Sequence, residues 1–152
     1  MAKERDKIRM SDAEVAEFLD GRHTMSVATI GKDGRPHLVA MWYGFLDGKP
    51  AFWTYSKSQK IRNLERDDRI TCMVEDGDTY DQLRGISLVG RGTVLRDEDS
   101  RMKIAESLFE RYTGPVNEAA RIALRKRGEK RVVVQIVVEK VISWDHRKLG
   151  ST

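Results

Sequence analysis

Short apolar segments separated by glycine-containing turns recur along the first half of this 152-residue chain. Thr24 to Ile30 is typical of a β-strand, and the turn Gly31 to Gly34 separates it from a longer apolar segment, Pro36 to Leu46. Asp47-Gly48 is a strong hairpin signal before a third segment, Ala51 to Tyr55. Antiparallel strands joined by tight turns form a meander, so the sequence predicts a sheet whose successive strands lie side by side.

Three further segments extend the predicted sheet. Ile70 to Val74 and Arg84 to Leu95 are typical of strands, and Arg131 to Val138 is typical of a buried strand. Glycines at positions 85, 90 and 92 mark bulges, bends or the close approach of a ligand. Six strands of this kind predict a small antiparallel β-barrel, whose closure would remove the exposed sheet edges.

Helical periodicity interrupts the strand pattern at several points. Ser11 and Glu14 have the spacing of a capping box at the start of a helix over Ser11 to Leu19, and Ser56 and Gln59 repeat it before a helix ending at Arg66. The length predicts one domain over residues 1–152, and the mixture predicts an α+β, mainly β fold with short flanking helices. Two longer helices are predicted over Asp97–Tyr112 and Asn117–Arg127.

The net charge and the single cysteine indicate the kind of ligand and the cellular compartment to expect. The net charge of +4 attracts anions such as nucleic acid, phospholipid or a phosphorylated cofactor. The basic run Arg121 to Arg131 is interpreted as a solvated helix end, so no nucleic-acid partner is expected. Cys72 has no partner for an internal disulfide, which fits a reducing compartment. With no signal peptide and no apolar run of ~20 residues, we expect a cytoplasmic protein without a membrane span.

Motifs for metal binding or nucleotide-phosphate binding are absent from the sequence. His23, His37 and His146 have no paired spacing and no cysteine partners, so no metal site is expected. Neither a Gly-x-Gly-x-x-Gly nor a P-loop pattern follows a strand, which excludes classical Rossmann and ATP-binding enzymes.

Two segments carry more specific chemistry. In Trp53 to Leu64 a strand ends and a helix begins among hydroxyl groups and lysines, and free N–H groups at a helix amino terminus attract anions. A capped helix with a solvated basic face explains this segment equally well. In Ser143 to Leu149 a tryptophan lies among polar and basic residues. This pattern is typical of a swapped tail that packs on a partner, and equally of a half-exposed core tryptophan at the end of a strand.

In this order, the two segments resemble the flavin/deazaflavin oxidoreductase superfamily, the split β-barrel group that includes pyridoxamine 5′-phosphate oxidases. The resemblance runs from SVATIGKDGRPHLVAMWY through FWTYSKSQKIRNLERDDRI and RGISLVGRGTVL to VISWDHRKL, which is most of the chain. The sequence is most similar to the branch that uses the 5-deazaflavin coenzyme F420 rather than FMN. The resemblance implies a six-stranded split barrel and a homodimer with two cofactor sites at the subunit interface.

The resemblance also implies roles for particular residues. Because the serine-x-lysine element matches, Ser58 and Lys60 are expected to contact the phosphate of the cofactor. The late tryptophan Trp144 would approach the cofactor of the other subunit, with Arg147 nearby. The strand Val39 to Tyr43 would run under the tricyclic ring and contact it largely through backbone groups. The full set of expected cofactor-binding residues is Val39, Ala40, Met41, Trp42, Trp53, Thr54, Lys57, Ser58, Lys60, Arg62, Asn63, Trp144 and Arg147.

Departures from the FMN oxidases indicate the deazaflavin. Those enzymes carry an Arg-to-Lys pair across the second strand and a second basic residue in the serine-x-lysine element, where this chain has Leu38 to Trp42 and Gln59. We therefore expect reduced F420 to deliver a hydride to a conjugated, electron-poor small molecule such as an enone, a quinone or a tetrapyrrole-like compound. No proton donor is certain, and the candidates are Tyr43, Tyr55 and His37. An FMN-dependent, pyridoxamine-phosphate-oxidase-like enzyme and a non-catalytic carrier of F420 or another ligand are the alternatives.

Overall fold

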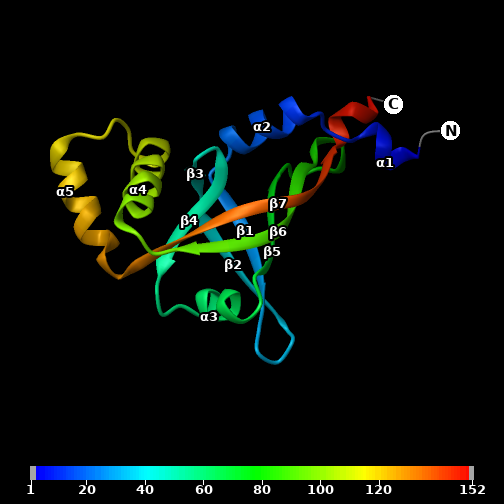
Figure 1. The fold of residues 1–152 in the computed structure, drawn as a ribbon. Helices are drawn as coiled ribbons and strands as arrows, with labels where there is room; N and C mark the ends of the chain where they lie inside the picture. The colour runs from blue at the N-terminus through cyan, green and yellow to red at the C-terminus, as the bar shows by residue number, and fades with distance from the viewer. Residues whose placement is uncertain (1–2, 151–152) are drawn as a thin grey trace.

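A curled antiparallel sheet forms the centre of the protein, with helices at its ends and along one side (Figure 1). The computed structural model describes residues 3–150. The seven strands follow the order β2-β1-β5-β6-β7-β4-β3, and all paired strands are antiparallel. The strands are β1 Thr24–Ile30, β2 Pro36–Trp42, β3 Gly44–Leu46, β4 Lys49–Tyr55, β5 Arg69–Asp76, β6 Arg84–Leu95 and β7 Arg131–Asp145.

The helices lie around this sheet in three places. In Figure 1, α2 lies above the strands, α3 lies below them, and α4 and α5 pack beside each other at one side. The helices are α1 Glu4–Lys7, α2 Asp12–Gly21, α3 Gln59–Arg66, α4 Glu98–Tyr112 and α5 Glu118–Arg127, and short 3₁₀ turns cover Tyr80–Gln82, Gly128–Lys130 and His146–Leu149. None of the helices in the described range 3–150 is long and apolar enough to cross a membrane.

The predicted mainly β split-barrel fold is confirmed, with one strand more than expected. The segment Pro36 to Leu46, predicted as one strand, is divided at Tyr43, whose buried side chain joins the core while its N–H donates to the His23 carbonyl. The predicted removal of sheet edges is wrong for the described chain, because β2 and β3 lie at opposite ends of the strand order and do not pair with each other.

The last strand is longer than predicted and contains a bulge. Val89 pairs with Lys140 and Gly90 pairs with Val138, so Glu139 is the extra residue on β7. A Cβ on Gly90 would lie 2.0 Å from the Val137 carbonyl oxygen, so only glycine fits at this position. The bulge lets one strand continue from Arg131 to Asp145 and connect the two ends of the molecule.

Two hydrophobic cores hold these elements together. The barrel interior contains buried side chains from β1, β4, β5, β6 and β7 and from α2 and α3, including Val27, Phe52 and Ile61. The second core lies between the outer face of β4 and β7 and the helices α4 and α5, and it includes Trp53 and Ile104. Successive side chains of a strand point to opposite faces, so β4 is buried on both sides and supplies residues to both cores.

Candidate functional site

The most unusual side chain near the strand-to-helix junction is a buried lysine. Lys60, the second residue of α3, is only 9% exposed, and its Nζ donates a hydrogen bond to Thr54 Oγ1 at 2.9 Å. The Thr54 hydroxyl lies 3.4 Å from Ser58 Oγ, so three polar side chains form one cluster. Within residues 3–150 no carboxylate lies within 4 Å of the lysine nitrogen.

Packing of α3 explains why this lysine is buried. Ile61 and Leu64 insert into the barrel core, and Asn63 Nδ2 donates to Thr29 Oγ1 of β1 at 3.0 Å. These contacts fix the helix across the end of the barrel and hold Lys60 against Thr54 of β4. Asn63 is fully buried and its Oδ1 accepts from Gln59 at 2.8 Å, so both ends of its amide are occupied within the protein.

The first turn of α3 is left open at its amino terminus. The predicted capping box of Ser56 and Gln59 is wrong, because the Ser56 N–H donates to the Lys130 carbonyl and the helix begins only at Gln59. Ser58 is the N-cap residue, and its side chain makes no capping hydrogen bond. Free N–H groups at a helix start carry partial positive charge, which adds to that of Lys60.

Together these features supply the positive charge and hydrogen-bond donors that an anion requires. Burial lowers the pKa of Lys60, because removing the ammonium group from water disfavours its charged form. Lys57 and Arg62, which are exposed and form no ion pair within the described chain, add further positive charge around it. A phosphate or carboxylate would supply the missing counter-charge and accept hydrogen bonds from the hydroxyl groups.

The lowered pKa gives a pH dependence with a definite sign. An anion binds to the charged form of Lys60, so affinity is constant while the lysine is protonated and falls as pH rises through its lowered pKa. We expect inorganic phosphate, followed by nuclear magnetic resonance between pH 8 and pH 11, to bind progressively more weakly, because Lys60 loses its charge over this range while the phosphate stays mainly a dianion. Lys60→Arg should give a flat profile, and a flat wild-type profile would contradict this assignment.

The structure does not bring Trp53 to this cluster. Its side chain is buried in the second core against α4 and α5, and its neighbour Thr54 points to Lys60 from the other face of β4. The Trp53 side chain therefore points away from the cluster in which the phosphate is expected. Strand alternation could have separated these two residues from the sequence alone.

Strand β2 presents two different faces. Val39 and Met41 pack against the barrel core, whereas Ala40 and Trp42 point outward, and Trp42 is 62% exposed. As an edge strand, β2 has one row of backbone groups without a strand partner within the described chain. This arrangement is compatible with backbone contacts to a flat ring.

Trp144 and Arg147 lie at the far end of β7. Thr54 pairs with Val132 near the start of that strand, and the 12 residues from there to Trp144 span up to about 40 Å. The Trp144 ring packs against Gly85, and Arg147 makes hydrogen bonds of 2.9 and 2.8 Å to Asp145. These two expected cofactor residues and the Lys60 cluster are therefore not brought together within one chain.

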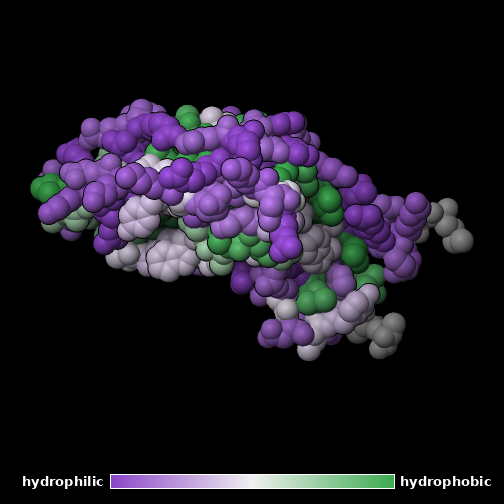
Figure 2. All heavy atoms as spheres, turned by 90° about the horizontal axis from the view of Figure 1, so that it is seen from below, coloured by the Kyte–Doolittle hydropathy of each residue, from purple (hydrophilic) through white to green (hydrophobic). Residues whose placement is uncertain are grey.

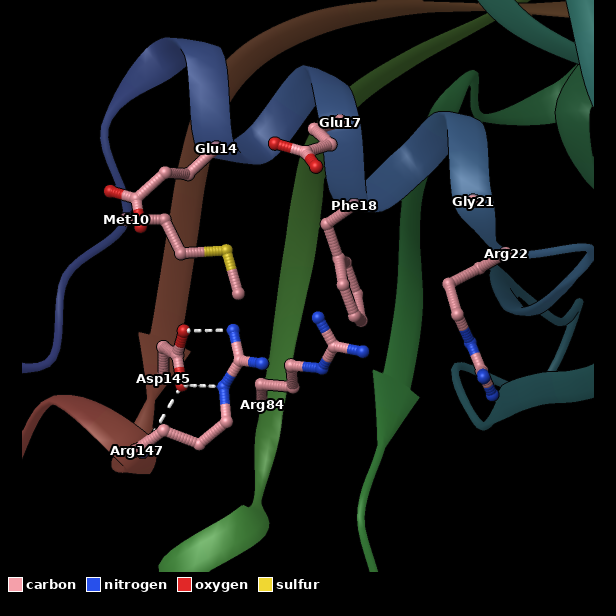
Figure 3. A pocket seen from close by; sticks show the side chains of 9 residues that line it. All are labelled: Met10, Glu14, Glu17, Phe18, Gly21, Arg22, Arg84, Asp145 and Arg147. Atoms are coloured by element: carbon pink, nitrogen blue, oxygen red, sulfur yellow. Dashed lines mark hydrogen bonds and ion pairs between the residues drawn. The ribbon is translucent and has the colours of Figure 1, made fainter.

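Arg147 is one of the residues that line a charged pocket of about 360 Å³ at this end (Figure 3). Arg84 lies over the Phe18 ring at 5.1 Å and pairs with Asp76 at 3.0 Å, while Arg22 lies 3.4 Å from the same carboxylate. Arg147 holds the pKa of Asp145 below its ordinary value through their hydrogen bonds. Each of these arginines thus already has a carboxylate partner.

The three proton-donor candidates have different surroundings. Tyr43 is fully buried, donates its O–H to the Leu19 carbonyl and has a pKa raised to about 12 by burial, so it is not an accessible acid. Tyr55 is 59% exposed and its oxygen accepts from Arg131. His37 lines a groove beside Gln59 and its Nδ1 is buried without a hydrogen-bond partner in the described chain. No metal-binding cluster of acidic, histidine or cysteine residues occurs in residues 3–150.

The strand order and the surrounding helices define a split-barrel protein of the pyridoxamine-phosphate-oxidase type. A family model described as pyridoxamine 5′-phosphate oxidase matches residues 11–145, and the chain belongs to this family. The resemblance to the flavin/deazaflavin oxidoreductase superfamily is thereby confirmed.

Named relatives extend this comparison. The chain is 30% identical over 145 residues to the F420H(2)-dependent biliverdin reductase of Mycobacterium tuberculosis (strain CDC 1551 / Oshkosh), covering 93% of each protein. It superposes on the crystal structure of Rv2991 from Mycobacterium tuberculosis with a TM-score of 0.95 and 45% identity, over 99% of this chain and 94% of that one. A structure named F420 Reductase superposes with a TM-score of 0.59 at 24% identity, over 82% of this chain and 93% of that one. At this identity the likeness concerns the fold alone.

Proposed function

We propose that this protein is an oxidoreductase that uses coenzyme F420 and reduces a conjugated, electron-poor small molecule. The observation that carries the proposal is the buried Lys60 ammonium without a carboxylate partner in the described chain, at the open amino terminus of α3. The relative named F420H(2)-dependent biliverdin reductase supports the choice of F420 and of a reductase.

The residues present fit a phosphorylated deazaflavin. Lys60, Thr54 and Ser58 would hold the phosphate, because hydrogen bonds from a charged group to phosphate are stronger than neutral ones. The exposed Lys57 and Arg62 would face the glutamates of the F420 tail. Reduced F420, when bound, supplies a hydride.

The remaining parts of the site would orient the ring and exclude water. The outward face and free backbone edge of β2, from Val39 to Trp42, would lie along the flat ring. Trp144 and Arg147 lie toward the opposite end of β7 from the residues that pair with Thr54, so we propose that a second copy supplies them in a homodimer. We assign no side chain as the proton donor, and solvent would protonate the product.

An exposed apolar surface is compatible with this dimer. The exposed large hydrophobic residues include Leu38 and Trp42 of β2 and three valines of β7, Val137, Val138 and Val141. Figure 2 shows hydrophobic patches within the mainly hydrophilic surface on the side seen from below. Burying such residues against a second copy would remove apolar area from water.

A turnover assay tests the proposal. The purified protein is mixed with reduced F420 and a panel of enones, quinones and biliverdin, and oxidation of F420 is followed by its absorbance. We expect acceptor-dependent oxidation with at least one member of the panel. Tight F420 binding without turnover of any member would favour a non-catalytic carrier, and turnover with FMN alone would favour an FMN-dependent oxidoreductase.

A further inference from the structure

Another cavity, apart from the Lys60 cluster, lies between the sheet and the helices α4 and α5. It has a volume of about 220 Å³. Trp42 stacks on Tyr112 with ring centroids 4.1 Å apart and planes 14° apart, which fixes one wall although Trp42 is largely exposed. The lining residues that matter here are Trp42, Trp53, Phe109, Tyr112, Arg127 and Arg131.

The two arginines of this cavity have no carboxylate within 4 Å in residues 3–150. The guanidinium of Arg131 lies between the rings of Trp53 and Tyr55, 4.8 and 4.7 Å from their centroids. Among residues 3–150, its Nη2 reaches only the Tyr55 oxygen, at 3.3 Å, and its buried Nε has no hydrogen-bond partner. A buried donor without an acceptor is costly, so this group points to an acceptor that comes from outside the chain.

The chemistry of the walls defines the class of ligand. Aromatic rings offer flat apolar surface and stack on other rings, while arginine recognises a planar carboxylate with two parallel hydrogen bonds. The cavity is smaller than the roughly 300 Å³ at which pockets for drug-sized ligands begin, so it suits one or two fused rings rather than a tetrapyrrole.

We propose that this cavity binds a small planar aromatic carboxylate, with the ring against the aromatic walls and the carboxylate on Arg131 and Arg127. The site is distinct from the Lys60 cluster because Trp53 and Thr54 point to opposite faces of β4. Trp42 is the one lining residue that the proposed function also assigns to the cofactor ring, whereas the carboxylate site on Arg131 and Arg127 uses no residue of the Lys60 cluster.

Calorimetric titration with 1-naphthoate and with its neutral isostere 1-naphthamide tests the proposal. We expect the wild-type protein to bind naphthoate at least about tenfold more tightly than naphthamide, since hydrogen bonds to a charged group are the stronger ones. Arg131→Gln should remove this preference, and Arg127→Gln, at an exposed helix end, should reduce it without a risk to folding. Lys126→Gln, the neighbouring exposed charge outside the cavity, and Lys60→Met should leave naphthoate binding unchanged.

A second readout locates the ligand. Naphthoate should shift the indole N–H resonances of Trp42 and Trp53 and leave that of Trp144, which does not line the cavity, unmoved. Equal affinity for the two probes, undiminished naphthoate binding in both arginine variants, or no binding of either probe would each overturn the proposal. A shift confined to Trp144 would overturn it as well.

Discussion

Replacing Lys60 by methionine should abolish most of the affinity for F420 while leaving the protein at least as stable as before. The substitution keeps the apolar stem and removes a charged hydrogen-bond donor from the anion site. A charged hydrogen bond contributes about 1.5–3 kcal/mol, which corresponds to a loss of about 10- to 150-fold in affinity. Fluorescence titration of the variant and the wild-type protein measures the difference.

The stability of the same variant separates a binding role from a structural one. Lys60 is buried without a compensating carboxylate in the described chain, and burying an unpaired charge opposes folding. Lys60→Met should therefore unfold at the same or a higher urea concentration. Lys126→Met, which changes an exposed lysine of α5, serves as the matched control and should affect neither property. Unchanged F420 affinity in Lys60→Met would place the phosphate elsewhere.

Gly90→Ala should be the most destabilising small change in the sheet. The added Cβ would lie 2.0 Å from the Val137 carbonyl oxygen and 3.1 Å from the Val138 Cα. These are backbone atoms of β7, where Val137 pairs with Arg91 and Val138 with Gly90 of β6, so they cannot move without disturbing that ladder. Overpacking costs about 1–3 kcal/mol and occasionally more, and we expect the free energy of unfolding to fall by about 3 kcal/mol because the backbone must shift.

Urea denaturation of Gly90→Ala measures this loss, and Gly21→Ala is its control. A Cβ on Gly21, the last residue of α2, meets no atom within 4 Å. The control should be as stable as the wild-type protein or gain up to about 1 kcal/mol, since alanine is the better helix former. If Gly90→Ala were as stable as the control, the bulge at Glu139 would not require glycine, and the account of the long β7 strand would be wrong.

Local patterns predicted most of the secondary structure. Thr24–Ile30 and Arg84–Leu95 have the predicted bounds, and Ser11 with Glu14 forms the predicted capping box, because these signals are set by side chains close in sequence. Pro36 to Leu46 was predicted as one strand because Tyr43 continues the apolar pattern. Its division at this residue depends on packing of the tyrosine in the core, which no local pattern contains.

The residues of the candidate site stay a prediction, and only part of their geometry follows from the sequence. The sequence indicated an anion site around Ser58 and Lys60, but the burial of Lys60 depends on α3 packing across the barrel end. The predicted capping box at Ser56 is wrong because a distant carbonyl, that of Lys130, occupies the Ser56 N–H. The cavity at Arg131 had no sequence signal, since its walls come from three strands and two helices.

Direct binding of the two candidate cofactors tests the central claim most directly. The wild-type protein is titrated with F420 and, separately, with FMN, and the fluorescence of its three tryptophans is followed. The proposed function predicts saturable quenching by F420 with one site per chain and a much weaker response to FMN. Saturable binding of FMN with no response to F420 would contradict it.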